Sequence, residues 1–137
     1  MTLDEVPGWA LELLSAERVA RLALMDEDDS PRLLPVTFAV WEGAVWSAID
    51  RKPKRSGEPA RVRRLRRRPE AALLVDRYDD DWTRLAWLEL RGAISIEPLG
   101  PALDVLAAKY PQYFDEPPQG PLLRLEPRRF ACWRAQG

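Results

Sequence analysis

The sequence contains no histidine and only one cysteine, Cys132. Without histidine there can be no Ser-His-Asp or Cys-His catalytic arrangement, no imidazole base at neutral pH and no histidine-ligated metal. A single cysteine excludes an internal disulfide and a cysteine-based metal site, and the apolar neighbours of Cys132 predict a small buried side chain. If the chain is an enzyme, we therefore expect a bound cofactor to supply the chemistry.

Long hydrophobic runs are also absent. No stretch approaches the roughly 18 consecutive apolar residues that span a bilayer, and the N-terminal segment lacks the basic region and long apolar run of a signal peptide. We therefore expect a cytoplasmic protein with no membrane partner. A chain of 137 residues, 46% apolar and 31% charged, is typical of one domain with a hydrophobic core, so residues 1–137 are assigned to a single domain.

Positive charge is sparse outside one segment. The net charge is -1, yet residues 51–68 contain ten of the 21 Lys and Arg residues and a single acid, Glu58. This concentration in an otherwise acidic chain predicts a local site for an anion. Nucleic-acid binding through "RVRRLRRR" is a less favoured alternative, because no aromatic residue interrupts the basic run and the remaining surface should repel a polyphosphate. The three acids at 79–81 lack further spaced ligands and predict a solvated turn without a metal.

Periodicity predicts a mostly β (α+β) domain. Helical spacing of apolar residues extends through 8–22, and extended segments follow at 21–26, 32–40 and 44–50. A short basic helix ends before Pro69, and strands are predicted at 70–78 and 84–97, the latter with apolar residues on one face only. A helix then follows, and residues 121–135 form one or two strands. Six strands with helices on either side of the central segment predict a small antiparallel barrel.

The order of these segments resembles a known superfamily. The segments "PVTFAV", "VWSAIDRKPK", "RRPEAALLVDRY", "DDDW" and "LAWLELRGAISIE" resemble the pyridoxamine 5'-phosphate oxidase-like split β-barrel proteins over residues 19–133. Within that superfamily the chain is most similar to the branch that uses the deazaflavin coenzyme F420. The resemblance implies a six-stranded antiparallel split barrel and a homodimer that binds two flavin-like cofactors in grooves along its interface.

The resemblance also implies an activity. It predicts an F420-dependent oxidoreductase that transfers hydride between the deazaflavin C5 and a small electron-poor substrate, with solvent, Tyr78 or an arginine as the proton donor. FMN in place of F420 is the alternative cofactor, and a non-catalytic cofactor-binding protein is an alternative function. The chain lacks the longer C-terminal substrate-binding segment of true pyridoxamine phosphate oxidases, so that particular activity is not expected.

The resemblance assigns cofactor-binding positions to four groups of residues. Two strands are expected to present the ring-binding backbone, and the small side chains of Ser47 and Ala48 are expected to leave room for a flat ring. A lysine after the second of these strands is expected to bind the phosphate. The spacing i, i+3, i+7 in the basic helix predicts a cationic face, free for a phosphate or for the oligoglutamate tail of F420. Two tryptophans are candidates to wall the site across the dimer, although large aromatics at such positions are more often core or interface. The predicted residues are Pro35, Val36, Thr37, Ser47, Ala48, Ile49, Asp50, Lys52, Lys54, Arg55, Arg61, Arg64, Arg68, Trp82 and Trp87.

Overall fold

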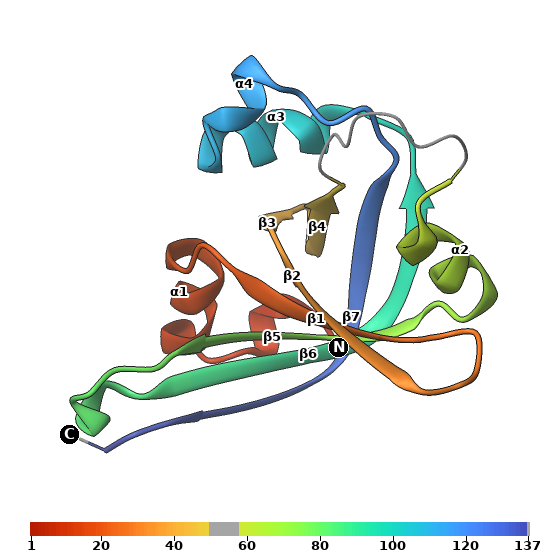
Figure 1. Cartoon of the computed structure of the whole chain (residues 1–137). Helices are drawn as coiled ribbons and strands as arrows, with labels where there is room; N and C mark the ends of the chain where they lie inside the picture. The colour runs from red at the N-terminus through yellow and green to blue at the C-terminus, as the bar shows by residue number, and fades with distance from the viewer. Residues whose placement is uncertain (50–57, 137) are drawn as a thin grey trace.

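The computed structural model describes residues 1–49 and 58–136, which form one seven-stranded antiparallel sheet with helices packed around it (Figure 1). The strands are β1 (Ala20–Met25), β2 (Pro31–Val36), β3 (Ala39–Trp41), β4 (Ala44–Ala48), β5 (Glu70–Arg77), β6 (Ala86–Glu97) and β7 (Leu122–Arg134). The α-helices are α1 (Gly8–Ala16), α2 (Ala60–Arg67), α3 (Pro101–Lys109) and α4 (Gln112–Asp115), and the 3-10 helices are η1 (Leu3–Glu5) and η2 (Trp82–Arg84). The predicted mostly β class is confirmed.

The sheet is strongly curled. Its strand order is β2-β1-β5-β6-β7-β4-β3, so β2 and β3 lie at opposite edges. Only Thr37 and Phe38 separate these two strands in the sequence. Because a residue spans at most about 3.6 Å, such a short connection can join the two edges only if they approach each other in space.

This connection also explains the difference in strand number. The sequence predicts one strand over 32–40 and six strands in total, whereas the described residues form seven. The chain leaves β1 after Val36 and joins β4 from Ala39 onward, so the single predicted strand becomes two short ones that pair with different neighbours. A continuous apolar pattern cannot reveal such a change of partner.

The two longest strands, β6 and β7, form the centre of the sheet. The predicted alternation in β6 is confirmed: Leu88, Leu90 and Ile94 are buried, while Trp87 and Arg91 are exposed. The pairing of β6 with β7 shifts register between Arg91 and Gly92. A Cβ atom at Gly92 would lie 1.9 Å from the Glu126 backbone oxygen, so the two backbones approach more closely here than a side chain permits.

Helix α1 packs against the inner face of the sheet, and it is shorter than predicted. It ends at Ala16, and Leu22 belongs to β1, where Ala20, Leu22 and Leu24 are buried in alternation. The prediction of one helix over 8–22 is therefore wrong beyond Ala16. Its apolar spacing at that point fits the period of a strand as well as that of a helix.

Two separate groups of apolar side chains form the core. The larger group joins α1 and α2 to β1, β5, β6 and part of β7. The smaller group, here called the α3–α4 core, joins α3 and α4 to β3 and β4, and includes Trp46, Leu106 and Leu122. Cys132 lies opposite Leu88 in the sheet and is partly exposed, rather than fully buried as predicted. None of the helices in residues 1–49 and 58–136 is long and apolar enough to cross a membrane.

Candidate functional site

The bend between β2 and β3 lies against the end of β4. Ser47 Oγ donates a hydrogen bond of 2.6 Å to the Thr37 carbonyl oxygen, and the Thr37 and Tyr113 hydroxyls are 2.6 Å apart. Strand β3 pairs with β4 only at residues 44–46, whereas β7 pairs with β4 through Ala48. Within the described part of the chain, the other edge of Ser47 and Ala48 therefore has no strand beside it.

Most ring-binding residues predicted from the sequence gather here. Val36, Ser47, Ala48 and Ile49 are buried, whereas Pro35 and Thr37 are more accessible. The small side chains of Ser47 and Ala48 are buried against protein, and their place beside a flat ring stays a prediction.

Helix α3 holds the same bend from the other side. The Tyr110 hydroxyl accepts a 3.1 Å hydrogen bond from Phe38 N–H and lies 3.0 Å from the Arg18 carbonyl oxygen. Burial raises the pKa of Tyr110. Sequence reasoning did not assign Tyr110 or Tyr113 to the site, because both lie more than 70 residues from the bend and no local pattern links them to it.

Lys109 lies beside this contact. Its Nζ is 3.6 Å from the centre of the Phe38 ring and donates a 3.0 Å hydrogen bond to the Leu14 carbonyl oxygen. Burial, followed by the positive charge of Arg18, lowers the pKa of Lys109 to about 8. The aromatic face favours the ammonium form, but burial has the larger effect on the pKa.

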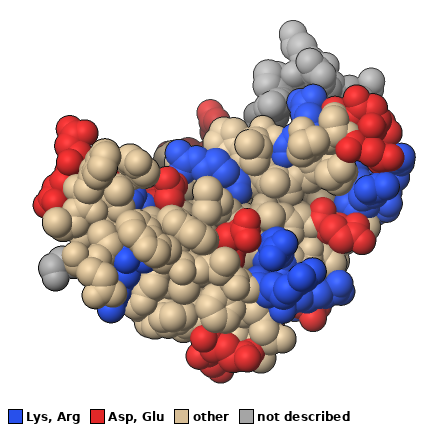
Figure 2. All heavy atoms as spheres, turned by 90° about the horizontal axis from the view of Figure 1, so that it is seen from below, with Lys and Arg blue, Asp and Glu red and all other residues tan. Residues whose placement is uncertain are grey.

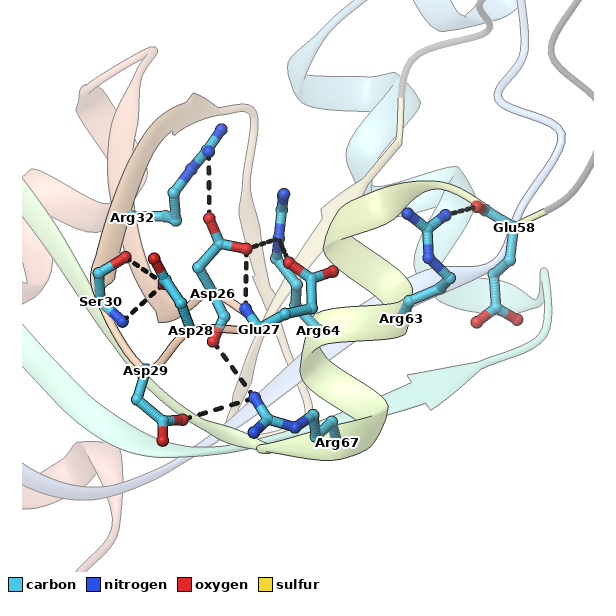
Figure 3. Close-up of polar contacts among 10 residues, drawn as sticks. All are labelled: Asp26, Glu27, Asp28, Asp29, Ser30, Arg32, Glu58, Arg63, Arg64 and Arg67. Atoms are coloured by element: carbon cyan, nitrogen blue, oxygen red, sulfur yellow. Dashed lines mark hydrogen bonds and ion pairs between the residues drawn. The ribbon is translucent and has the colours of Figure 1, made fainter.

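Two arginines of α2, Arg64 and Arg67, contact acids of the β1–β2 turn, while Arg63 contacts Glu58 (Figure 3). Arg64 Nε lies 2.9 Å from Asp26 and 3.4 Å from Glu27, and Arg68 lies 3.3 Å from Asp29. Arg64 and Arg68 are thus engaged within the protein, contrary to the free cationic face expected from the sequence. The physical reason is that the turn acids, 35 or more residues earlier in the chain, fold against the helix.

Asp26 is the centre of this cluster. Hydrogen bonding with Glu27, through its side chain and its backbone N–H, and then the Arg64 guanidinium hold the pKa of the Asp26 carboxyl well below its usual range. Side-chain exposures of 18% for Asp26 and 15% for Arg64 mark this as the most protected ion pair of α2. The side chains of Val62 and Leu65, on a neighbouring face of α2, are buried and anchor the helix to the core.

Four of the predicted residues cannot be placed. Asp50, Lys52, Lys54 and Arg55 lie outside the described residues. Arg61 lies in the first turn of α2 and is partly exposed. The assignment of these residues to an anion site stays a prediction.

The predicted tryptophans belong to the other end of the sheet. Trp87 lies on the outer face, directly opposite Trp133 of β7, and Trp82 is exposed in η2. The acids before η2 form a turn, because Asp81 accepts hydrogen bonds from Thr83 N–H and Thr83 Oγ1, at 3.1 and 2.6 Å. These bonds lower the pKa of Asp81.

The outer face of the sheet carries apolar side chains that none of the described helices covers. Trp87 and Trp133 are cross-strand partners, and Leu74 shares their face together with Asp76 and Glu89, with Leu33 toward the β2 edge. Trp87 is 36% exposed, Trp133 47% and Leu33 73%. Figure 2 shows a broad area without charged side chains on the underside of the molecule, with many charged residues toward the side of α2. Uncovered apolar area of this kind is typical of an interface.

Comparison with known proteins identifies the fold. No family model and no curated protein matches the sequence. Among solved structures, the conserved hypothetical protein Rv2991 from Mycobacterium tuberculosis matches with a TM-score of 0.75 and 20% identity over 98% of this chain and 85% of that one. An F420 reductase matches with a TM-score of 0.70 and 22% identity over 92% and 98%. A protein related to general stress protein 26, of the pyridoxinephosphate oxidase family, from Clostridium acetobutylicum matches with a TM-score of 0.65 and 19% identity over 92% and 86%. The chain therefore has the pyridoxamine 5'-phosphate oxidase-like fold.

Proposed function

We propose that this protein is an oxidoreductase that binds coenzyme F420 at a homodimer interface. The observation that carries the proposal is the meeting of the β2–β3 bend with the end of β4, where one edge of Ser47 and Ala48 lacks a strand among the described residues, immediately before the basic segment 51–68. One of the solved structures with this fold is an F420 reductase. The basic segment 51–68 also suits F420, which carries a phosphate and an oligoglutamate tail of carboxylates.

The described residues fit such a cofactor in one specific way. The backbone edge of Ser47 and Ala48, which pairs with no strand in the described part of the chain, is suited to hydrogen-bond the polar edge of a flat ring. The hydrogen bonds that Thr37 forms with Ser47 and with Tyr113 fix this end of the bend, so that this edge is held in place before a ligand binds. Bound F420 would supply hydride transfer from C5 to an electron-poor C=C or C=N group, while the protein orients the substrate.

In this proposal the basic segment divides into two functions. Lys52, Lys54 and Arg55 follow β4 closely in the sequence and would bind the phosphate together with Arg61, the first arginine of α2 along the chain. Arg64 and Arg68 are already paired with Asp26 and Asp29, so a role in binding the glutamate tail would require them to exchange an internal carboxylate for one of the ligand. The dimer would place Trp82 or Trp87 of one protomer beside the ring in its partner.

The first test compares the two cofactors on the same protein. We expect purified protein to bind F420 with submicromolar affinity and FMN at least tenfold more weakly, measured side by side by calorimetry. Tight FMN binding with weak F420 binding would support the FMN alternative. Absence of saturable binding for both would contradict the proposal.

A second test concerns the phosphate. Lys52→Ala should weaken F420 binding by about 1.5–3 kcal/mol, the usual range for losing a hydrogen bond to a charged group. Arg128→Gln, which removes an exposed arginine of β7, is the matched control and should leave the affinity unchanged. Equal affinities of Lys52→Ala and the unmodified protein would remove Lys52 from the site.

A further inference from the structure

A hollow lies at the opposite end of the sheet from α2. It has a volume of about 450 Å³ and is bounded by α1, the β5–β6 connection and the end of β7. In Figure 1 this region lies beside the C-terminus, on the side of the molecule away from α2 and the β1–β2 turn. The residues that give it chemical character are Trp9, Glu12, Arg77, Arg84 and Arg134.

Arg134 enters the hollow because of its register in the sheet. It pairs with Ala86, whose side chain is buried on the face covered by α1, so both side chains lie on that face. Alanine is short and leaves space at this position. The Arg134 guanidinium carbon lies 5.1 Å from the centre of the Trp9 ring, and none of the ion pairs formed among the described residues includes Arg134.

The other two arginines are only loosely paired. Arg77 lies 3.5 Å from Glu17, and Arg84 lies 3.6 Å from Asp79, distances longer than those of a good charge-assisted hydrogen bond. The lining of the hollow thus contains three guanidinium groups and one carboxylate, Glu12, while Glu17 and Asp79 lie near Arg77 and Arg84. Arg134, which forms no ion pair among the described residues, leaves a guanidinium group that can bind an added anion.

We propose that this hollow binds a small organic anion with a flat ring and a carboxylate or phosphate group. The anionic group would be held by Arg84 and Arg134, because guanidinium groups form paired hydrogen bonds with both kinds of oxyanion. The ring would lie against the apolar wall made by Trp9, Leu85 and Ala86. The volume lies within the roughly 300–1,000 Å³ of small-molecule sites.

This site uses different residues from the proposed cofactor site. Its residues come from α1, the end of β5, η2, the start of β6 and the end of β7, and none belongs to the β2–β3 bend, to β4 or to the basic segment. Trp82 and Trp87, the candidates to contact the partner's ring, do not line the hollow. The inference therefore stands or falls separately from F420 binding.

The experiment titrates the full chain with two probes at constant ionic strength. AMP tests a phosphate on a ring, and quinoline-2-carboxylate tests a carboxylate on a ring; adenosine serves as the uncharged control. We expect saturable binding of at least one anion, with adenosine at least about tenfold weaker. The stronger probe identifies the preferred anionic group.

Variants then locate the binding. Arg134→Gln and, separately, Arg84→Gln should each weaken the preferred probe by about tenfold or more, while the matched variant Arg128→Gln should not. No saturable binding of either probe would overturn the inference, as would equal losses in Arg128→Gln and the two pocket variants. Loss of AMP binding in Lys52→Ala, with none in Arg84→Gln or Arg134→Gln, would assign AMP to the basic segment and overturn it as well.

Discussion

Lys109 is a single residue whose protonation state depends on how the protein folds around it. Its pKa falls from 10.5 to about 8, because burial and the charge of Arg18 disfavour the ammonium form. The unfolded chain therefore binds more protons than the folded chain between about pH 8 and 10.5. In that pH range, raising the pH removes the proton from the partly buried Lys109, and the free energy of unfolding therefore increases.

This leads to a pH-dependent prediction for Lys109→Met. Relative to the variant, the unmodified protein should gain stability between pH 7 and pH 9.5, because only the unmodified protein releases this proton on folding. Urea unfolding of both proteins at the two pH values measures the difference, and other titrating groups cancel in it. A difference that stays constant, or that moves in the opposite direction, would contradict the lowered pKa.

At the scale of elements, the ion pair between Arg64 and Asp26 joins helix α2 to the β1–β2 turn. Arg64→Gln and Asp26→Asn should each lower the free energy of unfolding at pH 7, and the double variant should lose less than the sum of the two, because both changes break the same contact. The stability that Asp26 contributes is present above its unfolded pKa of 3.8 and is lost as the pH falls toward its depressed folded value.

The measurement is a double-mutant cycle by urea unfolding at pH 7 and again below pH 4. The coupling should shrink at the lower pH and also at high salt. Arg66→Gln, whose partner Glu58 is more exposed, is the matched control and should have a smaller effect. Purely additive losses at pH 7 would show that the pair does not anchor the helix.

The register shift in β6 gives a second prediction about an element. Gly92→Ala would place a methyl group 1.9 Å from the Glu126 oxygen, and backbone on both sides leaves little freedom to relax. We expect a loss of at least about 3 kcal/mol in the free energy of unfolding. Gly8→Ala is the control, because a Cβ at that position would contact nothing within 4 Å. Similar stabilities of the two variants would contradict the close approach.

The elements also show what the sequence could and could not reveal. The alternation in β6 and the anchoring of α2 by Val62 and Leu65 were predictable, because both depend on periodicity within one segment. The division of 32–40 into β2 and β3 was not, because it depends on which strand each half pairs with. The ion pair between Arg64 and Asp26 was equally unpredictable, because the two residues are 38 positions apart and no local sequence pattern links them.

At the scale of the whole molecule, the uncovered outer face predicts self-association. We expect a homodimer at micromolar concentration that buries Trp87 and Trp133. Trp87→Glu should weaken it by about 2 kcal/mol or more, as for a central aromatic in an interface. Sedimentation velocity measures the change, and Phe114→Glu, an exposed aromatic on α4, is the control. A monomer in the unmodified protein, or equal effects of both variants, would contradict an interface on this face.

The division of the core into two groups has a consequence for motion. The α3–α4 core is attached to the rest of the protein partly through the hydroxyls of Tyr110 and Tyr113, which also fix the β2–β3 bend. A region with its own small core can open locally while the larger core stays folded. Each such opening would break the bonds of Phe38 and Thr37 to the two tyrosines, so the backbone amides of the bend should exchange with solvent together with those of α3, as one cooperative unit.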